Sequence, residues 1–150
     1  MRLLAIDLGD KRIGLAIGET VAGTGRGIET VMRRSPAADG HRLRGIIAAN
    51  DIAAIVVGLP RHSDGREGAQ AIATRAWVAA VVEPLGLPWT FRDEAWTSQA
   101  AEANLGRPSR GRSGGPPSAA ARERRRRAVD REAARLILQA ELDERRRVRP

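Results

Sequence analysis

A chain of 150 residues with a formal net charge of +8 has the size of a single domain with one core. The absence of cysteine excludes disulfides and thiolate metal sites, so any metal must bind oxygen or imidazole. No apolar run reaches the roughly 18 residues of a membrane span. We therefore expect residues 1–150 to form one cytoplasmic domain with no membrane partner.

The excess positive charge lies in the last third of the chain. Residues 1–105 hold 12 basic and 12 acidic side chains, whereas residues 106–150 hold 14 basic and 6 acidic ones. Such a segment attracts polyanions by counterion release, and nucleic acid is the commonest intracellular polyanion. We therefore expect a nucleic-acid partner, and the alternative is a solvated basic tail.

The predicted elements are strands first and then alternating helices and strands. We expect strands at about 3–6, 13–17, 27–31, 52–59 and 87–92, and helices at about 38–50, 69–82 and 119–146. The first two strands form a hairpin, and the apolar run at 52–59 is typical of a buried central strand. Residues 106–118, rich in Gly, Pro, Ser and Arg, are expected to form a flexible basic loop. This order predicts an α/β fold with a central mixed sheet of five strands flanked by helices.

Carboxylates follow two of the predicted strands. Asp7 comes directly after the first apolar run, and Asp93 and Glu94 follow the last strand. An aspartate at such a position is often only a turn former. Adjacent acids repel, however, unless a cation or hydrogen bonds compensate. Glu94 is the expected site residue, and Asp93 takes its place if the strand phase is off by one.

Asp130 is the third candidate because of its position in the last helix. At about 100° per residue its side chain projects between those of Ala133 and Ala134, so it faces the sheet. A buried carboxylate must protonate, pair with a cation or bind metal. Two interpretations stay open: an ion pair with an arginine, or a shared site with Asp7 and Glu94 for hard divalent cations.

Four short motifs resemble the YqgF/RuvX family, whose members are Holliday junction resolvase-like nucleases also implicated in maturing the 5′ end of precursor 16S ribosomal RNA. The match covers nearly the whole chain in order. The motifs are AIDLGDKRIGLA at 5–16, VVGLP at 56–60 leading to Asp64 and Gly65, Asp93-Glu94 before Thr97, and Asp130 before Ala133.

The resemblance implies an RNase H-like fold and a nuclease that uses Mg²⁺ or Mn²⁺, with two metal ions held by Asp7, Glu94 and Asp130. The family commonly has arginine after the acidic pair, where this chain has Ala95. We expect nucleic acid to contact the basic side chains near the site and in the last helix. These are Lys11, Arg12, Arg61, Arg124, Arg125, Arg126 and Arg127.

Two other functions remain open from the sequence. A non-catalytic module that binds ribosomal RNA or DNA junctions would keep the fold and the basic helix. A sugar-kinase or actin-like ATPase also begins with Asp-x-Gly, but it needs two related domains, for which 150 residues are too few. If the substrate is a junction, symmetrical cuts favour a homodimer.

Overall fold

The computed structural model describes residues 1–61, 66–94, 97–108 and 110–149. Asp64, Gly65 and Ala95, which the resemblance singles out, lie outside these residues. The elements are β1 (Arg2–Leu8), β2 (Arg12–Glu19), β3 (Thr24–Met32), α1 (Pro36–Asn50), β4 (Ile52–Leu59), α2 (Ala69–Trp77), the π-helical turn η1 (Val78–Val82), the 3-10 turn η2 (Glu83–Leu85), β5 (Trp89–Asp93), α3 (Thr97–Leu105) and α4 (Ala119–Val148).

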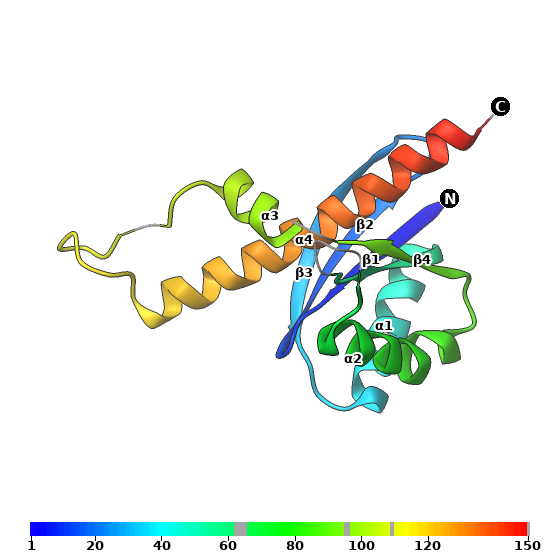
Figure 1. The fold of residues 1–150 in the computed structure, drawn as a ribbon, viewed down its shortest axis with the longest axis horizontal. Coiled ribbons are helices and arrows are strands. Elements are labelled where there is room, and N and C mark those ends of the chain that lie inside the picture. Colours follow the sequence, from blue (N-terminus) through cyan, green and yellow to red (C-terminus); the bar gives the residue numbers. More distant parts are fainter. Residues whose placement is uncertain (62–65, 95–96, 109, 150) are drawn as a thin grey trace.

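The five strands form one mixed sheet in the order β3-β2-β1-β4-β5 (Figure 1). β1, β2 and β3 are antiparallel neighbours, whereas β4 and β5 run parallel to β1. The predicted five-stranded mixed sheet is therefore confirmed. Because β1, β4 and β5 are parallel, residues at their carboxyl ends meet at one edge of the sheet, where ligands of open α/β sheets bind.

One face of the sheet is covered by α1, α2 and η1, and large side chains fill the space between them. Leu4, Ile6 and Val57 from the strands form one core cluster with residues such as Leu43 and Trp77 from the helices. This cluster explains why β1 and β2 appear in the sequence as apolar runs.

Among the described elements, α4 is the helix that covers the other face (Figure 1). Apart from Leu3 and Val56, the strand side chains of this face are small. Ala5, Ala16 and Ala54 from the strands pack against Ile137 and Leu138 of α4. Because these strand residues are small, the helix lies close to the sheet along its whole C-terminal half.

The N-terminal half of α4 continues past the sheet, and α3 lies beside it (Figure 1). Ser118 caps α4 by accepting a hydrogen bond from the Ala121 amide at 3.1 Å. No helix was predicted at α3, because Ala101 is its only described buried residue and its described residues form no apolar stripe. Within the described ranges, none of the helices is both long and apolar enough to cross a membrane.

Candidate acidic site and nucleic-acid groove

Asp7 reaches the candidate site from the end of β1, on the face that α4 covers. It pairs with Gly14 of β2, and α4 crosses the sheet directly over this pair. A Cβ atom at Gly14 would lie 2.1 Å from the carbonyl oxygen of Asp130, so only glycine admits the helix backbone at this distance. The close approach of α4 thus brings Asp130 next to Asp7.

Glu94 reaches the same place from the end of β5. Its amide donates to the Leu59 carbonyl at 3.2 Å, which extends the parallel pairing of β4 and β5 by one residue. Its carboxylate lies over Gly58, where a Cβ atom would approach Oε2 to 2.5 Å. The side chains of Glu94 and Asp7 are joined by a hydrogen bond. Glu94 is therefore the strand-end acid that meets Asp7, and the reserve position Asp93 is exposed.

The contact between these two carboxyls changes their protonation. The pKa of Asp7 is raised to about 6, mainly by burial. The hydrogen bond with Glu94 partly offsets this rise, and the charge of Asp130 adds to it. Burial and then the charge of Asp7 raise the pKa of Glu94 to about 9, with a smaller contribution from Asp93. At neutral pH the Glu94 carboxyl therefore stays protonated and donates a hydrogen bond to the Asp7 carboxylate.

Asp130 faces the sheet, as the helical phase predicts, and forms an ion pair. The Nε atom of Arg12 donates to its Oδ2 at 2.8 Å, and the two side chains are 19% and 23% exposed. Arg12 also lies 3.9 Å from a carboxylate oxygen of Glu123. The structure therefore confirms the first interpretation of Asp130, an ion pair with an arginine. Its charge also acts on Asp7, and a shared cation site stays a prediction.

The acidic side chains suit a hard divalent cation in chemistry, but they are not arranged as a finished site. Asp7 and Glu94 offer carboxylate oxygens, the ligands that Mg²⁺ and Mn²⁺ prefer, and a cation would relieve their repulsion. Among the described residues, however, no three His, Asp or Glu side chains are placed to hold one ion. Asp130 would have to leave Arg12 to become the third ligand.

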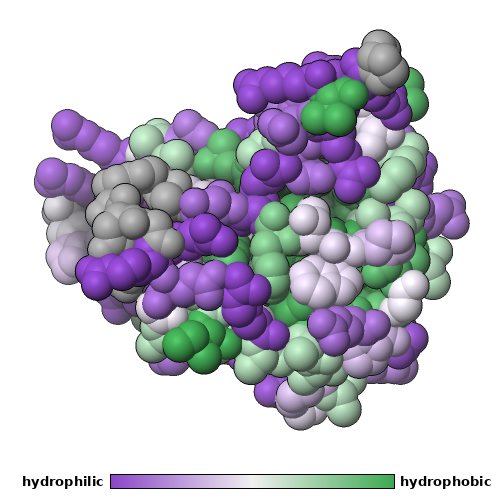
Figure 2. Space-filling view, turned by 45° about the vertical axis from the view of Figure 1, so that its right-hand side comes forward, coloured by the Kyte–Doolittle hydropathy of each residue, from purple (hydrophilic) through white to green (hydrophobic). Residues whose placement is uncertain are grey.

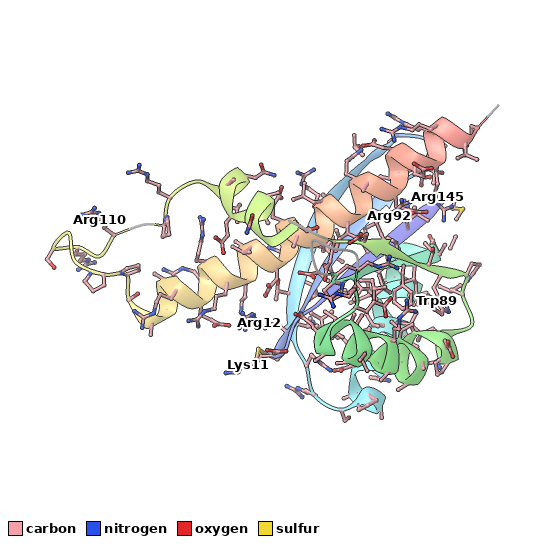
Figure 3. The ribbon with its side chains drawn as sticks, viewed as in Figure 1. Lys11, Arg12, Trp89, Arg92, Arg110 and Arg145 are labelled. Atoms are coloured by element: carbon pink, nitrogen blue, oxygen red, sulfur yellow. The ribbon has the colours of Figure 1, made fainter. Side chains whose placement is uncertain are left out.

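A buried ion-pair cluster ties the strand of Glu94 to the helix of Asp130. Glu141 of α4 contacts Arg92 of β5 and accepts a hydrogen bond from Arg145 at 2.7 Å. Burial acts to raise the pKa of Glu141, but the hydrogen bonds from both arginines outweigh it and hold the pKa below its usual value. Figure 3 shows Arg92 and Arg145 side by side at this junction.

The basic residues near the strand ends differ in their surroundings. Lys11 is exposed in the β1–β2 turn at the tip of the sheet (Figure 3). Arg61 is also exposed and lies 3.7 Å from a carboxylate oxygen of Glu67. Lys11 and Arg61 are thus more accessible to a phosphate than Arg12, which is held by Asp130. Nucleic-acid binding by all three stays a prediction.

The four consecutive arginines of α4 point in different directions, because each residue turns by about 100° around the helix. Arg124 and Arg126 are exposed. Arg127 turns toward Glu123, 3.3 Å away. Arg125 donates to three main-chain carbonyls at the end of α3, those of Glu102 at 3.2 Å, Leu105 at 3.3 Å and Gly106 at 2.6 Å. Arg125 therefore anchors α3 to α4.

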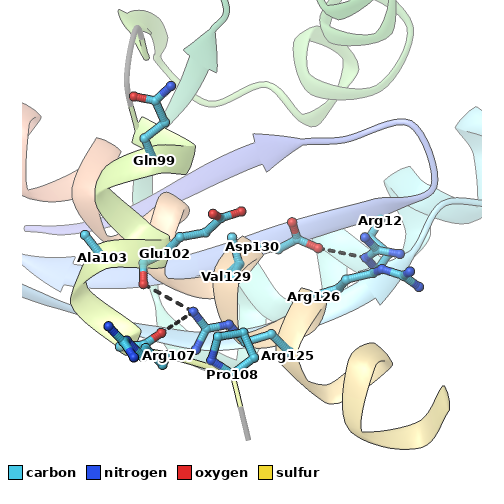
Figure 4. Close-up of a pocket in the computed structure, with 11 residues that line it drawn as sticks. Arg12, Gln99, Glu102, Ala103, Arg107, Pro108, Arg125, Arg126, Val129 and Asp130 are labelled. Atoms are coloured by element: carbon cyan, nitrogen blue, oxygen red, sulfur yellow. Dashed lines mark hydrogen bonds and ion pairs between the residues drawn. The ribbon is translucent and has the colours of Figure 1, made fainter. Parts of the chain in front are cut away.

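A groove of about 860 Å³ lies between α3 and α4 and reaches Asp130 (Figure 4). Arg107 and Pro108 lie at the end of α3, and the Arg12–Asp130 pair lies on the other side of Val129. The C-terminal end of α4 is basic as well: Figure 2 shows hydrophilic side chains crowding that end, at the top right, and the left-hand side of the same view. Of the candidate site residues Asp7, Glu94 and Asp130, Asp130 is the one that lines the groove between α3 and α4.

These features define an RNase H-like fold with acidic side chains at one edge of the sheet. The structure of RuvC from Thermus thermophilus in complex with a Holliday junction substrate has the same fold, with a TM-score of 0.54 at 16% identity over 97% of this chain and 96% of that one. The sequence profile of the RuvX family, described as Holliday junction resolvase, matches residues 1–144. The chain belongs to the RuvX family, as its motifs indicated.

Relatives with high coverage agree with this assignment. A protein named "Putative pre-16S rRNA nuclease" from Anaeromyxobacter sp. is 39% identical over 97% of this chain and 98% of its own length. A protein of the same name from Moorella thermoacetica is 36% identical over 95% of both chains.

Sequence reasoning missed the residues that shape the site without contributing a charge. One of them is Gly14, which admits the backbone of α4 to the sheet. The contacts of Arg125 with α3 were also missed, because α3 itself has no apolar stripe. A row of Gly and Ala at alternating strand positions was the one available signal of a closely packed helix.

Proposed function

We propose that this protein is a metal-dependent nuclease that hydrolyses phosphodiester bonds in structured nucleic acid. The observation that carries the proposal is the contact between Asp7 and Glu94, two carboxyls from different strand ends that share a proton beside Asp130. Such an arrangement costs stability and has no packing purpose. The names of the family and its relatives support the same activity.

Asp7, Glu94 and Asp130 would hold Mg²⁺ or Mn²⁺ in this proposal. A bound divalent cation supplies activation of water and neutralises charge on the scissile phosphate. Glu94 must release its proton before it can act as a ligand, so binding of the ion should tighten as the pH rises. Asp130 joins the set only after its ion pair with Arg12 opens.

The substrates follow from the same comparisons. A DNA junction and precursor 16S ribosomal RNA are the two structured nucleic acids that the family description and the names of the relatives indicate. Arg124, Arg126 and Lys11 are exposed and would contribute affinity through phosphate contacts without reading bases. Symmetrical cutting of a junction would require two copies of the chain.

The test is the nearly isosteric substitution Asp7→Asn, which removes the charge that holds the cation. We expect cleavage of a labelled junction and a labelled precursor RNA in Mn²⁺ to fall by more than about 100-fold, the upper end of the losses caused by second-shell changes. Folding and nucleic-acid binding should persist. The matched control is Asp10→Asn, an exposed residue of the adjacent turn, which should cut at the parent rate.

A second function has one observation in its favour. Asp130 is already neutralised by Arg12, as expected of a module that binds nucleic acid without cutting it. Cleavage by neither the parent nor Asp7→Asn on either substrate, with binding retained, would establish that function. Equal cleavage by both proteins would remove Asp7 from the proposed site.

A further inference from the structure

We infer that the groove between α3 and α4 holds a single strand of nucleic acid and leads it to the acidic residues. This inference rests on the proposed function and adds to it the class of substrate: a duplex or junction with an unpaired segment next to the scissile bond. The groove is lined by α3 on one side and by α4 on the other, and Asp130 belongs both to the groove and to the acidic site.

The size of the groove favours one strand over two. Its volume of about 860 Å³ is within the roughly 300–1,000 Å³ of sites that hold small ligands. A few nucleotides fill such a space. A duplex, whose major groove alone is about 12 Å wide, is too bulky for a site of this volume.

The charges of the groove suit a sugar-phosphate backbone. Arg107 makes no hydrogen bond or ion pair with another described residue, and Arg126 has only a 3.7 Å contact with Glu123 while its side chain is 57% exposed. Both line the groove and are free to contact phosphates. Single-strand binding proteins use basic grooves of this kind, and their binding depends strongly on salt.

Arg125 has a different role in the same groove. Its guanidinium donates hydrogen bonds to the three carbonyls at the end of α3, and these bonds fix the distance between α3 and α4. These carbonyls have no partner within α3, because the last turn of a helix leaves its acceptors free. Arg125 is therefore a positioning residue, whereas Arg107 and Arg126 are the expected phosphate contacts.

The experiment compares two double variants that lose the same charge. Arg107→Gln/Arg126→Gln removes the two free cations of the groove. The control Arg147→Gln/Arg149→Gln removes two exposed cations from the opposite end of α4. Binding is measured in chelator, so that nothing is cut, to a labelled duplex with a single-stranded extension and to the blunt duplex of the same sequence. Thermal unfolding confirms that both variants are folded.

We expect the parent and the control to prefer the extended duplex, and the groove variant to lose this preference. The slope of log affinity against log salt for the extended duplex should fall by about 1.4 in the groove variant, since each phosphate contact to a single strand contributes about 0.7. The control should keep the preference.

Two results would overturn the inference. One is equal binding of both duplexes by the parent, and the other is a groove variant that keeps its preference or weakens both duplexes equally. Cleavage is scored separately, with Mn²⁺ added. A parent that prefers the extended duplex but cuts nothing contradicts the proposed function and leaves the groove intact. A parent that cuts junctions without preferring the extension contradicts the groove alone.

Discussion

The two faces of the sheet are both covered by helices, yet they are built from different side chains. The face under α1 and α2 carries Leu, Ile and Val, whereas the face under α4 carries mainly Gly and Ala beside Leu3 and Val56, with Asp7 and Glu94 at its edge. Burial of large apolar side chains stabilises the first face. The smaller side chains of the second face contribute less of this stabilisation. Because they are small, α4 lies close enough to the sheet to place Asp130 beside Asp7.

Buried carboxyl groups also differ between the apolar face and the acidic edge of the sheet. Under α1 and α2, Asp39 is buried and satisfied: it accepts hydrogen bonds from the Trp77 indole at 3.2 Å and the Arg34 amide at 3.0 Å. At the edge under α4, Asp7 and Glu94 have each other as partners, and both pKa values are raised. The difference shows which carboxylates serve packing and which are available to a ligand.

The largest expected effect comes from closing the space under α4. Gly14→Ala places a Cβ atom against the backbone of Asp130, which cannot move without the helix. We expect a loss of about 1–3 kcal/mol in the free energy of unfolding, as for other overpacked sites, together with loss of cleavage. Urea unfolding and the cleavage assay measure the two losses.

Gly45→Ala is the matched control on the other side of the sheet. Gly45 lies within α1, and a Cβ atom there meets nothing within 4 Å. This variant should gain up to about 1 kcal/mol, because alanine is the better helix former, and it should cut normally. Gly14→Ala with parental stability would show that α4 is not held against β2 as described.

The extent to which the sequence predicted the molecule follows the same division. The apolar face was predictable, since the apolar runs in β1 and β4 reflect burial. Asp7 and Asp130 were predictable from a strand end and a helical phase. The pairing of Asp130 with Arg12 was not, because 118 residues separate them and only the approach of α4 to Gly14 brings them together. Nothing in its local sequence marked Arg12, among the arginines, as the partner of Asp130.

The next effect concerns pH and is confined to the acidic edge. The pKa values of Asp7 and Glu94 are about 6 and about 9 in the folded protein, against ordinary values of 3.8 and 4.5. The folded protein therefore keeps protons that the unfolded chain releases, so stability is greatest at low pH and is lost as the pH rises through the folded values. In chelator we expect the Tm to fall by at least several degrees between pH 5.5 and 9, because a difference of one in a pKa corresponds to about 1.4 kcal/mol and each kcal/mol lowers the Tm by about 2–4 °C at this length.

Glu94→Gln tests the origin of this pH dependence. The amide cannot titrate, so the decline in Tm between pH 5.5 and 9 should become flatter. Glu67→Gln is the control, since Glu67 is a carboxylate on the protein surface whose pKa is lowered by its hydrogen bond with Arg75. It should decline as the parent does. An equal decline in all three proteins would locate the titrating groups elsewhere.

The smallest expected effect concerns Arg12, which neutralises a carboxylate that the proposed metal site requires. Opening an ion pair of this kind costs up to about 1 kcal/mol, so Arg12→Gln should tighten the binding of Mn²⁺ alone by up to about fivefold in calorimetric titration. Arg42→Gln breaks a pair of equal length, 2.8 Å, with Glu29 away from the acidic edge, and should leave Mn²⁺ binding unchanged. Weaker binding by Arg12→Gln would mean that the arginine orients Asp130 for the ion. Tighter binding would mean that Arg12 and the metal ion compete for the Asp130 carboxylate. In the metal-free protein, Arg12 would then neutralise this carboxylate at the acidic edge of the sheet until a metal ion replaces it.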